Sequence, residues 1–375
     1  MIFRYQIKFI NKDFLKNFYL FIILKAIGCF FVFSFLSIYD SRIFSFTDLE
    51  FYNRSNINIY SANYIFSLFV KLLGYSPENV LSIKFLSLSF LISSIFTAPY
   101  LYLSTKYHNY KSTFFYIILL SFHPYLSLYS LKLDTSIFGL FAISFFSLYV
   151  FEASSNTFSI SLLITSISTL FRNALLPFSL SYIGIYLFFK KRDWNLINNL
   201  IIWFSFFVIG FVLFSQIGYG LDYVQQNYGC YSFSNIKIYL ESFLGYDISS
   251  PLAYIITPIV HLALDLGARE AISIYCINLP VNLASSNTLN IISTFVFFIF
   301  HFLVFCKFIF EICKKITYRK IQLFLPLTIL LPTLYGTAHM RYLIPLIPLL
   351  MFFLFENQIS DERYNVTKKL LILSQ

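Results

Sequence analysis

The chain has 375 residues, of which 58% are hydrophobic and only 12% are charged. That charged fraction is about half of what a typical water-soluble domain carries, and a soluble fold could not keep so much apolar surface out of water. The net charge of +10 does not indicate nucleic-acid binding, because the basic residues form short clusters between apolar runs rather than one basic face with interleaved aromatic side chains. The composition therefore predicts an integral membrane protein.

A membrane-spanning helix needs roughly 20 predominantly apolar residues, and about ten apolar runs, some of them shorter, follow one another along the chain. The first run is too long for the apolar part of a signal peptide and lacks a small-residue cleavage site, so we interpret it as the first membrane anchor. We expect an all-α integral membrane protein with about ten transmembrane helices. The expected spans cover residues 17–38, 80–103, 113–131, 135–151, 157–171, 174–189, 196–217, 289–312, 321–337 and 340–356.

The clusters of Lys and Arg orient this set of spans. If the N-terminus is cytoplasmic, alternation of the spans brings most of the basic residues to the cytoplasmic side, as membrane proteins prefer. Both termini are then cytoplasmic, and residues 1–356 form one polytopic domain followed by a cytoplasmic tail, 357–375.

Two long segments, about 39–79 and 218–288, are left on the opposite, outer side. Within the first, Tyr60 to Leu73 is amphipathic but too short and too polar to span, and we expect it to lie as a helix in the membrane interface. The second contains Cys230 and Cys276, which form either a disulfide or two unrelated thiols.

The first outer loop carries two carboxylates, Asp48 and Glu50, followed by Tyr52. In an extended stretch the two carboxylates point to the same side. They could act as a general base or hold a divalent metal ion. A solvated acidic loop without a chemical role is the alternative interpretation.

Further polar residues lie near the outer ends of the expected spans. Pro124 should kink the third span, and Lys132 and Asp134 lie where the third and fourth spans meet, either in a site or as ordinary boundary charges. Arg172 interrupts an apolar stretch, and a membrane-embedded arginine usually faces the protein interior with a partner such as a carboxylate or phosphate. The last outer turn contains His339, Arg341 and Tyr342, which either grip an anionic headgroup or anchor the chain in the interface.

Together these elements resemble the GT-C superfamily of polytopic glycosyltransferases, in particular the bacterial branch of protein O-mannosyltransferases and aminoarabinose transferases. Leu49 separates the two carboxylates, which are often adjacent in that family. The resemblance covers most of residues 1–356. It is carried by Asp48, Glu50 and Tyr52, the amphipathic 60–73, Pro124 and Asp134, Arg172, and the group Arg341, Tyr342 and Pro345.

The resemblance implies an enzyme of the bacterial inner membrane that transfers a sugar from a polyprenyl-phosphate-linked donor to a glycan, lipid or protein acceptor on the extracytoplasmic face. By analogy Asp48 would deprotonate the acceptor, Glu50 would position it or help bind a divalent metal ion, and Arg172 and Arg341 would hold the phosphate. Tyr52, Lys132, Asp134, His339 and Tyr342 would complete the substrate site.

Two other functions remain open from the sequence. An O-antigen or capsular polysaccharide polymerase uses similar lipid-linked sugars, but commonly relies on arginines in large outer loops. A transporter or flippase would place ionisable residues near the middle of the membrane and pair them across helices. We expect only Lys25 and Lys84 there.

Overall fold

The computed structural model describes residues 12–39, 64–74, 82–131, 135–152, 155–172, 284–314, 322–330 and 343–358, together with short stretches between 175 and 183. The regular elements within these ranges are all helical. They are α1 (Lys12–Tyr39), α4 (Tyr64–Leu72), α5 (Ile83–Tyr107), α6 (Tyr110–Phe122), α7 (Pro124–Leu131), α8 (Ser136–Glu152), α9 (Ser155–Phe171), α16 (Ala284–Lys314), α19 (Ile347–Phe352) and the 3-10 helices η6 (Leu325–Leu330) and η8 (Phe353–Gln358).

Two of these helices are long and apolar enough to cross a membrane: α1 over Lys12–Ser34 and α5 over Ile83–Tyr107. Helices α6 and α7 qualify together as a third span if they are counted as one helix that is bent by 56° at the break between them. Helices α8 and α9 are apolar but shorter. A membrane protein built from helices is thus supported. The expected span 196–217 lies outside the described residues, and the span 174–189 is described only in short stretches.

The outward faces of α1 and α16 are apolar. On α1 the exposed side chains include Tyr19, Ile23, Ile27 and Phe30, whose spacing of three or four residues places them on one side of the helix. Helix α16 exposes a similar set, including Phe302, Leu303 and Phe310. Surfaces of this kind are rare on water-soluble monomers and are suited to contact with lipid.

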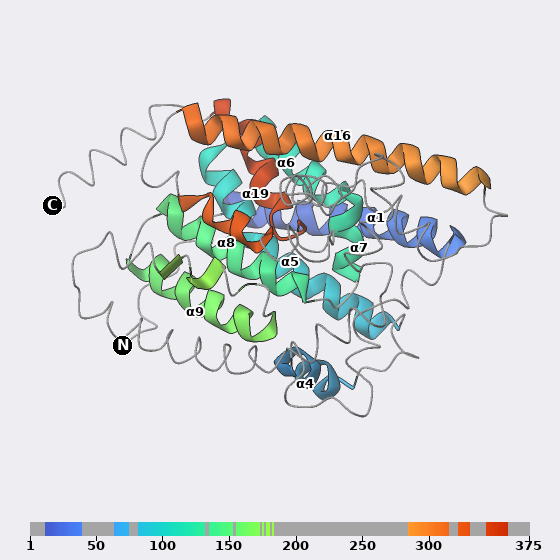
Figure 1. Ribbon diagram of the computed structural model, residues 1–375, viewed down its shortest axis with the longest axis horizontal. Coiled ribbons are helices and arrows are strands. Elements are labelled where there is room, and N and C mark those ends of the chain that lie inside the picture. Colours follow the sequence, from blue (N-terminus) through green and yellow to red (C-terminus); the bar gives the residue numbers. More distant parts are fainter. Residues whose placement is uncertain are drawn as a thin grey trace, which may run out of the picture.

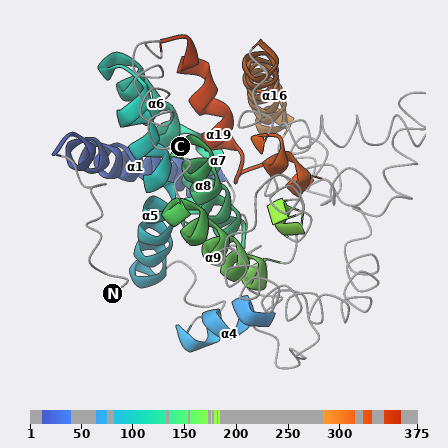
Figure 2. The same ribbon diagram turned by 90° about the vertical axis from the view of Figure 1, so that its left-hand side faces the viewer.

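Helix α5 lies in the middle of the bundle, between α1 on one side and α8 on the other, while α4 and α16 lie at opposite edges (Figure 1). Helices α1 and α5 are antiparallel, because Asn17 Nδ2 donates to Thr105 Oγ1 at 3.1 Å, whereas Lys25 Nζ reaches Ser93 Oγ at 2.8 Å. Helix α9 packs along the outer side of α8 (Figure 2).

One end of the bundle, which we name the Lys106 end, carries an ion pair between Lys106 Nζ and Glu152 Oε2 at 2.6 Å. The hydroxyl of Tyr107 donates to the same carboxylate at 3.2 Å. The ring of His108, in the turn after α5, stacks on Phe352 of α19 with 4.3 Å between ring centroids. The C-terminal ends of α5, α8 and α19 therefore meet here.

The opposite end, which we name the α4 end, is formed by the N-terminal parts of α5 and α8 and by the C-terminal part of α9. Phe66 and Val70 of α4 are buried against Phe85 of α5 and Phe138 of α8. Since α1 runs antiparallel to α5, its C-terminus at Tyr39 also points to the α4 end.

The predicted kink at Pro124 is a full break between α6 and α7, and a nearby side chain binds one of the carbonyl groups that the break leaves without a helical partner. Ser127 Oγ donates to Ser121 O at 3.1 Å, and Cys29 Sγ donates to Ser127 O at 3.6 Å. Gly28 brings α1 close to the break, since a Cβ at that position would lie 2.2 Å from Ser121 O. The irregular backbone is thus enclosed by protein.

One expectation about the elements needs correction, that of Lys84. The described part of the expected span 340–356 begins with a turn at 343–346, which leads into the six-residue α19 and then η8. Pro345 and Pro348 lack the N–H groups that a continuous helix needs. Lys84 is not a midspan residue: it is the second residue of α5, is exposed, and donates to Leu73 O at 3.4 Å.

Candidate functional site

The first turn of α8 is the place where distant parts of the chain meet, and we name Ile137, Phe138 and Gly139 the α8 junction. The ring of Phe138 stacks on Phe171, the last residue of α9, with 4.2 Å between centroids and 11° between planes. The ring of Phe66 from α4 meets it edge-on at 6.0 Å. The α8 junction therefore joins the described part of the first expected outer loop to the C-terminus of α9.

The segment that follows Arg341 and Tyr342 reaches the same junction. A Cβ on Gly139 would lie 2.7 Å from Pro345 Cγ, so only glycine accommodates this contact without a shift. Leu343 and Ile344 are buried next to it. The residues that immediately follow the last expected outer turn thus pack against α8.

Arg172 is the predicted site residue that the structure describes. It directly follows Phe171, and its side chain is only 2% exposed. Its backbone N–H donates to Ser168 O at 2.9 Å, continuing α9, and its carbonyl accepts from Leu175 N at 3.0 Å. A buried guanidinium is therefore held by regular backbone at the α4 end, beside the α8 junction.

The other predicted site residues, Asp48, Glu50, Tyr52, Lys132, Asp134, His339, Arg341 and Tyr342, lie outside the described residues. Their described neighbours share one location. The first loop is attached through Tyr39 and α4, and the Lys132–Asp134 connection begins at Leu131 and ends at Thr135, next to the α8 junction. The attachment points of all these segments lie at the α4 end.

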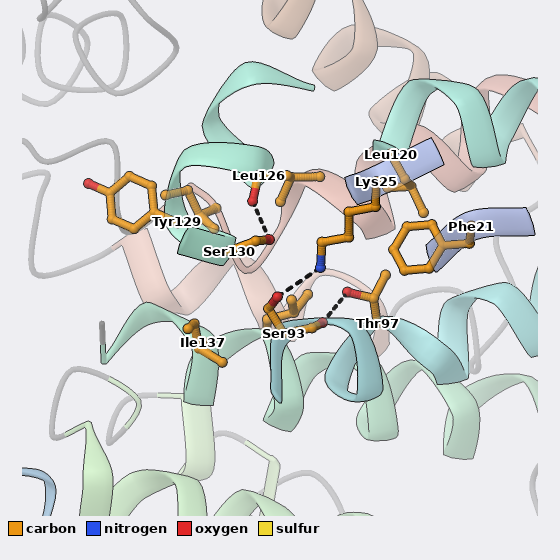
Figure 3. A pocket seen from close by; sticks show the side chains of 11 residues that line it. Phe21, Lys25, Ser93, Thr97, Leu120, Leu126, Tyr129, Ser130 and Ile137 are labelled. Atoms are coloured by element: carbon orange, nitrogen blue, oxygen red, sulfur yellow. Dashed lines mark hydrogen bonds between the residues drawn. The ribbon is translucent and has the colours of Figure 1, made fainter. Parts of the chain in front are cut away.

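A small cavity lies on the inner side of the α8 junction and is lined by Ile137, Ile344 and the buried Lys25, among others (Figure 3). The volume within which the centre of a water molecule can lie is about 20 Å³, which is enough for one or two waters. This space is far too small for a sugar phosphate, so the cavity does not serve as the expected substrate site.

Polar side chains and an aromatic ring of the cavity wall contact Lys25. Its Nζ donates to Ser93 Oγ at 2.8 Å and to Ser94 Oγ at 3.1 Å, and it lies 5.3 Å from the ring centroid of Phe21. Both serine hydroxyls donate their protons to Phe90 O, which turns their lone pairs toward the ammonium group. No carboxylate in the described ranges forms an ion pair with Lys25.

The sequence did not reveal a pair of buried histidines at the break between α6 and α7. His123 Nε2 lies 2.8 Å from Nε2 of His301, which comes from α16. Each side chain is at most 4% exposed. A histidine inside the apolar run 289–312 was the available signal, since ionisable groups within membrane helices are usually functional.

The sequence also did not reveal the pairing of Lys307 with Glu311 along α16, although Glu311 is only 3% exposed. Their spacing of four residues places them on one helix face, so this pair neutralises a buried carboxylate within one element.

Within the described part of the chain, no group of three His, Cys, Asp or Glu side chains could hold a metal ion. The carboxylates expected to bind a metal, Asp48 and Glu50, lie outside it.

Comparison with known proteins adds no relative: no protein-family model, no curated protein and no solved structure matches this chain.

Proposed function

We propose that this chain is a membrane glycosyltransferase of GT-C type, which transfers a sugar from a polyprenyl-phosphate-linked donor to an acceptor on the extracytoplasmic face of the bacterial inner membrane. The observation that supports this proposal is the convergence at the α8 junction. Aromatic contacts of Phe138 join α4 to the Phe171–Arg172 end of α9, and Gly139 contacts Pro345, which follows the Arg341 segment. Such a meeting point is what a site assembled from distant segments requires.

The proposed chemistry uses carboxylates from the first loop and guanidinium groups from distant helices. Asp48 removes a proton from the acceptor hydroxyl as its oxygen attacks the anomeric carbon, and the bond to the phosphate oxygen breaks. Arg172 and Arg341 stabilise the charge that develops on the departing polyprenyl phosphate. Glu50, Tyr52, Lys132, Asp134, His339 and Tyr342 hold the two substrates, and Asp48 and Glu50 would hold a divalent metal ion if one takes part.

The proposal places the α4 end at the outer membrane surface and the Lys106 end in the cytoplasm. Lys12, Lys16, Lys106 and Lys111 belong to the Lys106 end, as the preference for basic residues on the cytoplasmic side requires. Burial of the apolar face of α4 at the other end suits a helix lying along the interface. The proposal includes about ten spans, as the apolar runs predict.

Asp48→Asn tests the catalytic role. We expect this substitution to reduce sugar transfer from a polyprenyl-phosphate monosaccharide at least about a hundredfold, since a general base contributes that much or more. Asp13→Asn, a matched change in the first turn of α1 at the Lys106 end, should leave transfer intact. Full activity of Asp48→Asn, at equal protein abundance in the membrane, would remove Asp48 from the mechanism.

Retention of a polyprenyl phosphate tests the two arginines separately from catalysis. We expect Arg172→Gln and Arg341→Ala to weaken its binding about tenfold or more, because each removes a charge-assisted contact to phosphate. The uncharged polyprenol of the same length serves as the control ligand, and Lys71→Ala on α4 as the control variant. Equal binding of the phosphate by the wild type and both arginine variants would contradict the proposal.

Transport is the second candidate, and the His123–His301 contact across helices at a broken span favours it. Vesicles containing the purified protein distinguish the candidates. Transport predicts that a labelled polyprenyl-phosphate monosaccharide moves between the leaflets without an acceptor, whereas a transferase releases its sugar only when the acceptor is present. A polymerase would give products that lengthen with time, whereas a transferase adds one sugar.

A further inference from the structure

His123 and His301, which we name the imidazole pair, connect three helices inside the bundle. His123 lies between α6 and α7, and its carbonyl accepts the first backbone hydrogen bond of α7 from Ser127 at 2.9 Å. The two Nε2 atoms are 2.8 Å apart, and the ring centroids are 5.0 Å apart. At that distance one nitrogen carries the proton and the other accepts it.

The surrounding hydrogen bonds assign this proton. The backbone N–H of Leu126 donates to His123 Nδ1 at 3.3 Å, so Nδ1 carries a lone pair and the proton of neutral His123 is on Nε2. His123 therefore donates to His301, whose own proton is on Nδ1. In this tautomer His123 also acts as the N-cap of α7, which Asp, Asn, Ser and Thr usually provide.

An additional proton has no place on these two contacts. On His301 Nε2 it would face the N–H of His123, and on His123 Nδ1 it would face the N–H of Leu126. Protonation must therefore break either the contact to α16 or the cap of α7. Two imidazolium rings at this separation would also repel each other.

Within the described part of the chain, the other ionisable groups near the imidazole pair take part in contacts of their own. The ring of Tyr125 lies 5.9 Å from His123 and 6.1 Å from His301, centroid to centroid. On α1, the thiol of Cys29 donates to Ser127 O, and Lys25 points to the hydroxyls of α5. On α16, Lys307 and Glu311 neutralise each other. The one carboxylate among these described groups, that of Glu311, is thus already paired.

We propose that the imidazole pair is a proton-binding site that holds α16 against the α6–α7 break at neutral pH and releases it when a further proton binds. This inference goes beyond glycosyl transfer and is independent of it. The hydrogen-bond pattern also argues against a metal at this site, because a ligating histidine normally donates its second ring nitrogen, whereas His123 Nδ1 accepts.

The experiment uses the full chain in lipid bilayers with ¹⁵N-labelled histidine. We expect a scalar coupling between the two Nε2 nuclei across the hydrogen bond at pH 8, absent from His301→Asn and lost in the wild type near pH 5. Hydrogen exchange in α16 around His301, corrected for the intrinsic effect of pH, should accelerate about tenfold over the same range.

His123→Asn and His108→Asn complete the test. Asparagine keeps the cap of α7 but removes the shared proton, so His123→Asn should abolish the acid-induced change in α16, whereas His108→Asn should retain it. The proposal is overturned if the wild type has no coupling at pH 8, or if α16 exchange is insensitive to pH. It is also overturned if stoichiometric Zn²⁺ binds at pH 8 and depends on both histidines, because the pair would then be a metal site.

Discussion

Gly28 determines how closely α1 can approach the break between α6 and α7. A Cβ at this position would lie 2.2 Å from Ser121 O and 3.1 Å from its carbonyl carbon. These are backbone atoms, and Ser127 Oγ already binds the same oxygen, so the neighbour cannot move away at low cost. The absence of a side chain at one residue therefore allows the α1 contact with the broken span.

Gly28→Ala should accordingly destabilise the protein. Alanine gains up to about 1 kcal/mol in helix propensity, but the forced shift of α1 costs about 1–3 kcal/mol, so the net change is a loss. Thermal unfolding in detergent measures it, with Ile27→Ala at the exposed neighbouring position as the control. An unchanged or higher midpoint for Gly28→Ala would show that α1 does not pack as described.

At the scale of elements, the turn between α5 and α6 carries a histidine that resists protonation. Burial lowers the pKa of His108 from its usual 6.5 to about 4. Its Nδ1 lies 3.0 Å from Ser104 Oγ, and its ring stacks on Phe352. An unfolded chain would therefore bind a proton at this residue at a higher pH than the folded protein does.

This difference predicts an acid-sensitive contact between α5 and α19. As the pH falls from 6.5 to about 4, the unfolded state binds more protons than the folded state, so stability decreases, by up to about 1.4 kcal/mol per pH unit. His108→Phe keeps the stacking and removes the titration. Its unfolding midpoint should therefore change less with pH over this range than that of the wild type. Parallel pH profiles of the two proteins would contradict the prediction.

The sequence predicts where individual helices lie better than it predicts which helices contact one another. The apolar runs at 17–38, 80–103 and 135–151 correspond to α1, α5 and α8 within a few residues, because a bilayer requires a minimum apolar length. Pro124 indicated a kink for a local reason, the missing N–H. The contact between His123 and His301 joins residues 178 apart in the chain, and no local pattern encodes it. The α8 junction was not foreseen for the same reason, although Arg172 beside it was.

At the scale of the whole molecule, the apolar outward faces of α1 and α16 are suited to contact with lipid. Helix α16 offers a direct comparison, because it carries two exposed cysteines on one element, Cys306 and Cys313. Cys313 precedes Lys314 at the helix terminus, whereas Cys306 lies about 10 Å further along the axis, at 1.5 Å per residue. If the apolar face of α16 contacts acyl chains, the two thiols differ in their access to water and not in their burial by protein.

Labelling with a charged maleimide should distinguish the thiol of Cys306 from that of Cys313. Only a thiolate reacts, and a thiolate does not form in a hydrocarbon environment. In variants that retain a single cysteine, Cys313 should react in inside-out vesicles and not in right-side-out ones, and Cys306 should react only after solubilisation in SDS. Equal labelling of Cys306 and Cys313 in intact vesicles would mean that this face of α16 contacts water. Labelling of Cys313 from outside would reverse the proposed orientation, place the α4 end in the cytoplasm, and rule out sugar transfer on the extracytoplasmic face.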